Sequence, residues 1–84
     1  MRADDRLKRL RIRAWRRGIK EMDLILGRFV DEQAATLDAD ELDRLEALME
    51  ESDLDLYSWV TGRVEPPAAH APLIDRIAAF SVAG

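Results

Sequence analysis

Residues 37–49 read Leu-Asp-Ala-Asp-Glu-Leu-Asp-Arg-Leu-Glu-Ala-Leu-Met and contain both the start signal and the buried face of a helix. Asp38 can cap this helix, because Glu41 follows three residues later and can reach back to the backbone N–H of Asp38. Leu37 and Leu42 stand at the two positions of a hydrophobic staple. Apolar residues then recur at helical spacing, at Leu42, Leu45, Leu48 and Met49. We therefore expect a short amphipathic helix that ends near residue 51.

Apolar residues at helical spacing also precede this stretch. A first helix is expected over residues 6–16, and residues 16–18 (Arg-Arg-Gly) then mark a break or a sharp corner. A second helix follows from Ile19, with Gly27 tolerated in its interior at some cost in stability. The buried faces expected for these two helices consist of Leu7, Leu10 and Ala14, and of Ile19, Met22, Ile25, Leu26, Phe29 and Val30.

Two further helices are expected after residue 51. Ser52 or Asp53 can cap a short fourth helix, and Gly62 is available to end it. The apolar residues of this helix fall on two sides, so either it is fully buried or one side is left for a partner. A stiff linker over residues 63–71 contains His70, which is expected in solvent, and a last helix begins near residue 72.

The sequence thus predicts an all-α fold, a small single-domain bundle of four to five short helices over residues 1–84. No segment alternates with the period of a strand, and disordered ends are expected at residues 1–4 and 81–84. With 84 residues, 48% of them apolar and 36% charged, the chain has the composition of a small globular domain.

The composition also excludes several kinds of chemistry. The chain has no cysteine and one histidine, which excludes disulfides, thiol nucleophiles and zinc sites built on histidine pairs. We expect no catalytic residue and no metal site. No apolar run is long enough to span a membrane, and Asp4 and Asp5 make the N-terminus unlike a secretory signal. A cytoplasmic protein is expected.

Charge is divided unevenly along the chain. Residues 1–28 hold ten Lys/Arg against four Asp/Glu, whereas residues 29–84 hold three against thirteen. Such asymmetry favours an oriented encounter with a charged partner. The basic N-terminal helix could instead belong to a nucleic-acid-binding or generic protein-interaction module, although phosphate would repel the acidic remainder. An enzyme that clamps a dicarboxylate with arginines is another alternative, but few arginines follow residue 28.

A candidate contact surface lies beside the apolar face of the second helix. Arg17, Glu21, Leu24 and Arg28 are spaced so that, in one continuous helix, they would share a flank, with Gly18 at its edge. A charged stripe with an apolar centre is typical of a protein-binding edge. The alternative is structural: Arg17 and Glu21 would form an intrahelical ion pair, and Leu24 would be an isolated exposed residue.

These residues resemble a known family, the small FAD assembly (flavinylation) factors of succinate dehydrogenase, or SdhE-type proteins. The family motif Arg-Gly-x-x-Glu stands here as residues 17–21, and the acidic residue usually found two positions later is Asp23. A second family segment, Asp-x-Asp-Leu-aromatic-x-Trp, stands as residues 53–59. The resemblance covers about residues 6–78, with one departure at Leu54, where relatives often carry proline.

The resemblance implies a helical bundle that binds the flavoprotein subunit of succinate dehydrogenase, with fumarate reductase as a second candidate partner. It implies that the chain promotes covalent attachment of FAD to a histidine of that subunit. The flavoprotein subunit would catalyse this attachment itself. The chain would then hold no cofactor of its own, bind no nucleic acid and not insert into a membrane. By the same resemblance Arg17, Gly18 and Glu21 would contact the flavoprotein near its flavin, with Asp23, Asp55 and Trp59 as further candidates.

Overall fold

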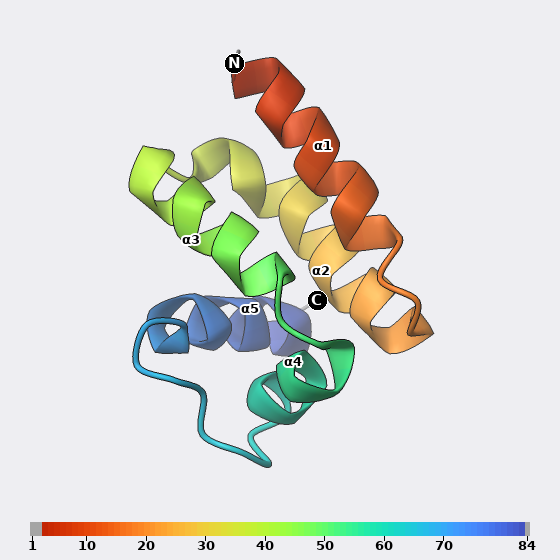
Figure 1. Cartoon of the computed structure of the whole chain (residues 1–84), viewed down its shortest axis with the longest axis vertical. Coiled ribbons are helices and arrows are strands. Elements are labelled where there is room, and N and C mark those ends of the chain that lie inside the picture. The colour runs from red at the N-terminus through yellow and green to blue at the C-terminus, as the bar shows by residue number, and fades with distance from the viewer. Residues whose placement is uncertain (1–2, 84) are drawn as a thin grey trace.

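The computed structural model describes the backbone of residues 3–83 and the side chains of residues 5–81, and this part of the chain is helical with short connections (Figure 1). The expected all-α bundle is confirmed. The elements are α1 (Ala3–Trp15), α2 (Lys20–Gln33), the 3-10 turn η1 (Ala34–Thr36), α3 (Ala39–Met49), α4 (Asp53–Val60) and α5 (Ala71–Ala83). Disorder at residues 1–4 and 81–84 stays a prediction: the structure places residues 3 and 4 in α1 and residues 81–83 in α5, and residues 1, 2 and 84 lie outside the described residues.

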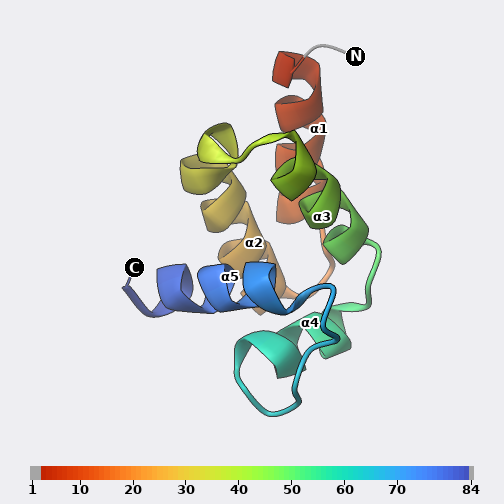
Figure 2. The same ribbon diagram turned by 90° about the vertical axis from the view of Figure 1, so that its left-hand side faces the viewer.

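The helices form two groups. α1, α2 and α3 lie side by side at one end of the molecule, and α4 and α5 lie across the other end (Figures 1 and 2). α1 packs along α2, whereas α5 contacts α2, α3 and α4 and so joins the two groups. No helix in the described part of the chain is long and apolar enough to cross a bilayer.

Local capping signals set the starts of α3 and α4 as expected. The Asp38 carboxylate accepts the Glu41 N–H at 2.8 Å, and the Glu41 carboxylate accepts the Asp38 N–H at 3.1 Å, so the capping box is complete. At α4 the cap is Ser52, whose hydroxyl accepts the Asp55 N–H at 3.2 Å. Each bond satisfies a backbone donor that the first turn of a helix leaves free.

A single apolar core holds the helices together, and nearly all residues of the predicted buried faces contribute to it. Leu7, Ile19, Ile25 and Phe80 are only partly buried against it. On the two-sided helix α4, Leu56 is buried and Leu54 is 73% exposed. The buried members are Leu10, Ala14, Met22, Leu26, Phe29, Val30, Ala34, Leu37, Leu42, Leu45, Leu48, Met49, Leu56, Leu73, Ile74 and Ile77.

Ion pairs join the basic helix α1 to its acidic neighbours. Arg6 pairs with Asp43 and with Glu46, and Arg13 pairs with Glu50 at 2.9 Å. The carboxylates of Asp43 and Glu46 accept hydrogen bonds from Arg6 and raise the pKa of its guanidinium above the ordinary value. The Asp43 and Glu50 side chains are mostly exposed, so solvent screens these pairs and each contributes little to stability. They do hold the Arg6 and Arg13 side chains toward the acidic residues of α3 and of its C-terminal end.

Gly27 permits the close contact between α1 and α2. The Trp15 ring lies against this glycine, and a Cβ placed on Gly27 would lie 2.8 Å from Cε3 of the ring and closer still to Cδ2 and Cε2. The indole Nε1–H of Trp15 donates to Asp31 Oδ2 at 3.1 Å, which fixes the ring over α2. The cost of a glycine inside a helix is therefore offset by a contact that no other residue allows.

Replacing Gly27 with alanine tests this contact. At an unconstrained helix interior the change would raise stability by about 0.5–1 kcal/mol. Here we expect Gly27→Ala to lower the free energy of unfolding by about 1–3 kcal/mol, because the new methyl group overpacks against the indole. Urea denaturation followed by circular dichroism measures the change. In a Trp15→Ala background the same substitution should be neutral or stabilising, and equal destabilisation in both backgrounds would contradict the role of the ring.

Candidate partner-binding site

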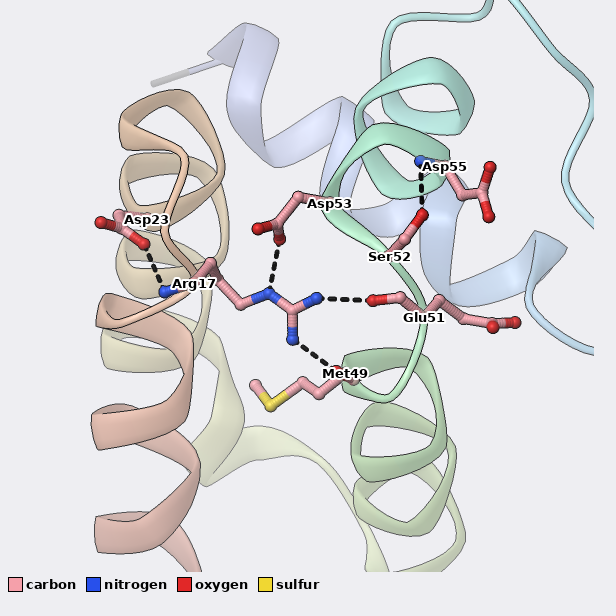
Figure 3. A network of polar contacts seen from close by, with 7 residues as sticks. All are labelled: Arg17, Asp23, Met49, Glu51, Ser52, Asp53 and Asp55. Atoms are coloured by element: carbon pink, nitrogen blue, oxygen red, sulfur yellow. Dashed lines mark hydrogen bonds and ion pairs between the residues drawn. The ribbon is translucent and has the colours of Figure 1, made fainter.

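Arg17 lies in the connection between α1 and α2 and joins it to the junction of α3 and α4 (Figure 3). Its Nε donates to Asp53 Oδ1 at 2.7 Å. One terminal nitrogen donates to the Glu51 carbonyl oxygen at 2.6 Å, and the other donates to the Met49 carbonyl oxygen. The Arg17 and Asp53 side chains are only 11% and 14% exposed, the most buried ion pair among the described residues.

The expected intrahelical ion pair between Arg17 and Glu21 is therefore wrong. Their spacing predicted a contact only if both residues lay in one helix. In the structure α2 begins at Lys20, and its N-cap Ile19 has extended backbone angles (φ −111°, ψ 124°). Arg17 thus lies outside the helix, and its charge is paired by a carboxylate far along the chain.

Helix electrostatics strengthen the Arg17 contacts. The last carbonyls of a helix lack intrahelical partners and carry partial negative charge, so a guanidinium at the end of α3 is favourable. Asp53 is the first residue of α4, where a carboxylate is favourable for the opposite reason. The arginine is held by charge-assisted hydrogen bonds to three groups, so its buried charge is compensated. Removing it would leave Asp53 charged and without this partner.

Asp23 and Gly18 shape the turn itself. The Arg17 backbone N–H donates to Asp23 Oδ1 at 2.6 Å, which ties the turn to the first part of α2. Gly18 is exposed and has φ +104°, a conformation that residues with a side chain rarely adopt. A Cβ on Gly18 would meet no atom closer than Asp53 Oδ2 at 4.0 Å, so the space around it is open toward solvent.

Three predicted site residues remain together on the outer flank of α2. Glu21, Leu24 and Arg28 are all exposed, and their spacing of three and four residues places them on one side of the helix. Leu24 is 45% exposed, which gives this flank an apolar centre between opposite charges. The exposed flank therefore consists of these three residues, with Gly18 in the exposed turn before it and without Arg17, and its role as a contact surface stays a prediction.

The two predicted site residues on α4 are not part of this flank. The Asp55 carboxylate points away from Arg17, although Asp55 follows shortly after the ion-paired Asp53 (Figure 3). Trp59 is half-buried, with its ring centre 5.8 Å from that of His70. Trp59 therefore contributes to packing between α4 and the linker before α5.

Two contacts within the domain were missed by reasoning from the sequence. Asp53 was expected only as an alternative helix cap, yet it pairs with Arg17, and its place in the second family segment was the available signal. His70 was expected in solvent, but its side chain is 14% exposed and its Nε2 lies 3.2 Å from Glu51 Oε2. Glu51 thus contributes its carbonyl to Arg17 and its carboxylate to His70.

The hollows on the described surface match side chains in size. One of them, between α2 and α5, has a volume of about 110 Å³. In the part of the chain that the structure describes, no three His, Asp or Glu side chains lie close enough to hold a metal ion.

Comparison with known proteins agrees with this geometry. Residues 8–81 match a family model described as the flavinator of succinate dehydrogenase. The chain is 38% identical over 73 residues to the FAD assembly factor SdhE of Acetobacter pasteurianus, a match that covers 86% of this chain and 67% of that protein. It is 40% identical over 58 residues to the mitochondrial succinate dehydrogenase assembly factor 2 of Candida glabrata, covering 69% of this chain and 38% of that protein.

A plant protein is similar as well. The mitochondrial succinate dehydrogenase assembly factor 2 of Arabidopsis thaliana is 33% identical over 63 residues, covering 75% of this chain and 34% of that protein. The chain therefore spans about two thirds of the length of the Acetobacter relative and little more than a third of the length of these mitochondrial ones. All three relatives are named as assembly factors.

Substitution of Arg17 tests its structural role. We expect Arg17→Ala to lower the free energy of unfolding by about 1.5–3 kcal/mol, because it leaves the largely covered Asp53 carboxylate and the carbonyls of Met49 and Glu51 without their partner. Arg16→Ala is the matched control, since Arg16 is exposed and has no ion pair in the described part, and should change stability by about 0.5 kcal/mol or less. Chemical denaturation of both variants gives the comparison. Equal, small losses would place the Arg17 contacts among the weak surface pairs.

Proposed function

The chain belongs to the family of succinate dehydrogenase flavinators, and from this membership we propose that it binds the flavoprotein subunit of succinate dehydrogenase and promotes covalent attachment of FAD to it. The names of the relatives support both halves of the proposal, because one names FAD assembly and the others name assembly of succinate dehydrogenase. The observation that carries it is the exposed Gly18 turn, followed by the flank of Glu21, Leu24 and Arg28.

The chain acts in this proposal by positioning the partner. Holding reacting groups in the correct geometry can remove several kcal/mol from a barrier without any chemical group from the helper protein. In this proposal the flavin is held by the flavoprotein. The flavoprotein of fumarate reductase is a second proposed client of the same surface, and action in the cytoplasm stays a prediction.

Gly18 should act through its contact with the partner. Gly18→Ala and Gly18→Arg share the strain of φ +104°, but only arginine fills the open space beside the turn. We expect both variants to lose a similar amount of stability, about 1 kcal/mol, and only Gly18→Arg to lose most of the promotion of flavinylation. The assay mixes each variant with apo-flavoprotein and FAD and reads covalent flavin by in-gel fluorescence. Full activity of Gly18→Arg would remove Gly18 from the contact surface.

Glu21 should behave in the same way for a different reason. It is exposed in the first turn of α2, so Glu21→Ala loses only a small favourable interaction with the helix dipole, about 0.3–1 kcal/mol. We expect near-normal melting and a large loss of flavinylation in the same assay. Glu32→Ala, at an exposed position late in α2, is the matched control and should retain activity. If both variants lost activity equally, general loss of negative charge would explain the result.

The unpaired cations near the N-terminus should speed association with the flavoprotein. Lys8, Arg9, Arg16 and Lys20 are exposed and have no ion pair among the described residues. We expect the double variant Lys8→Glu/Arg9→Glu to slow association about tenfold at low salt and to flatten its salt dependence, with little change in dissociation. Arg44→Glu, on α3, is the control. A salt-insensitive association rate of the wild-type chain in stopped-flow measurements would contradict steering.

A further inference from the structure

A groove between α2 and α5 continues the proposed contact surface. It is lined by Leu24, Ile25, Arg28, Phe80 and Ser81 and has a volume of about 110 Å³. Leu24 and Arg28 belong to both the groove and the exposed flank of α2. A partner that covered this flank would therefore also cover the mouth of the groove.

The floor of the groove is apolar and firmly supported. Ile25 and Phe80 are half-buried and pack against the core. The Phe80 ring meets the buried Phe29 ring edge to face, with ring centres 5.8 Å apart and planes inclined by 63°. Such a contact favours a defined ring position. The groove is thus anchored by the core between two packed helices.

The rim of the groove is positively charged. Arg28 is exposed, and none of the described carboxylates lies within ion-pair distance of it. Ser81 adds an exposed hydroxyl on the α5 side. An apolar floor beneath a free guanidinium fits an apolar side chain next to a carboxylate, because each part of such a segment would find its complement.

We propose that this groove receives a segment of the partner flavoprotein that inserts one aliphatic or aromatic side chain and places an Asp or Glu against Arg28. The inference rests on the proposed function and names the surface and the partner chemistry through which it would act. A second copy of this chain is a poorer occupant. Two-fold pairing over the groove would bring the same charged rim, and so the two Arg28 side chains, toward each other.

Two variants test the groove by different means. Ser81→Trp fills it from the exposed end of α5, and Arg28→Glu reverses the rim charge. Their controls are Ala79→Trp, at an exposed position of α5 that does not line the groove, and Arg44→Glu, which reverses an exposed arginine on α3. Biolayer interferometry with immobilised apo-flavoprotein gives Kd, and circular dichroism confirms that each variant is folded.

We expect Ser81→Trp and Arg28→Glu to raise Kd at least tenfold, the controls to stay within twofold of wild type, and Arg28→Lys to retain most of the affinity. If wild type binds and promotes flavinylation but both groove variants bind normally, the groove proposal is overturned and the proposed function stands. If wild type does not bind, the proposed function itself fails. A dimer of the isolated chain that Ser81→Trp converts to a monomer in light scattering would identify a second copy as the occupant and overturn the proposal.

Discussion

The Arg17 guanidinium connects the turn between α1 and α2, the end of α3 and the start of α4, which are far apart in the sequence. It binds the Asp53 carboxylate and the carbonyls of Met49 and Glu51 while the Arg17 backbone N–H is held by Asp23 (Figure 3). Each contact satisfies a group that would otherwise be buried without a partner. The position of the Gly18 turn, and hence of the surface beside it, depends on this one side chain.

The packing of α1 neutralises part of the uneven charge along the chain within the domain itself. Arg6 and Arg13 are paired with carboxylates on or directly after α3, and Arg11 lies 3.6 Å from Asp31 of α2. Much of the basic charge of α1 is therefore balanced within the domain, and these arginines are engaged with carboxylates. A nucleic-acid module would need a continuous basic face, which this pairing and the acidic remainder of the chain oppose. The remaining free cations suit a weaker role in guiding encounter.

Local signals made part of this structure predictable. The capping box at Asp38 and the leucine stripe of α3 lie within a few residues of one another, so the sequence alone indicated them correctly. The break at residues 16–18 and a second helix from Ile19 were expected, but Arg17 was wrongly placed on the flank of that helix because Arg17 and Glu21 have the spacing of a helical pair. A positive φ at Gly18 and a pair between residues 17 and 53 depend on how the helices come together, and neither leaves a periodic pattern in the sequence. The exposed flank of Glu21, Leu24 and Arg28 was found because helical spacing alone defines it.

An assembly factor that acts by positioning its partner needs a rigid contact surface. An exposed turn containing glycine would lose conformational entropy on binding, and that loss would weaken the complex. The Arg17 contacts order the turn when the chain folds. The conformational entropy of the turn is therefore already lost before a partner binds. Arg17 and Gly18 are adjacent, yet in the proposed function their substitutions would act at different stages: Arg17 variants through the folded fraction, and Gly18 variants through the complex with the partner. Activity measured for Arg17 variants therefore has to be normalised to the fraction of folded protein before it says anything about contact with the flavoprotein.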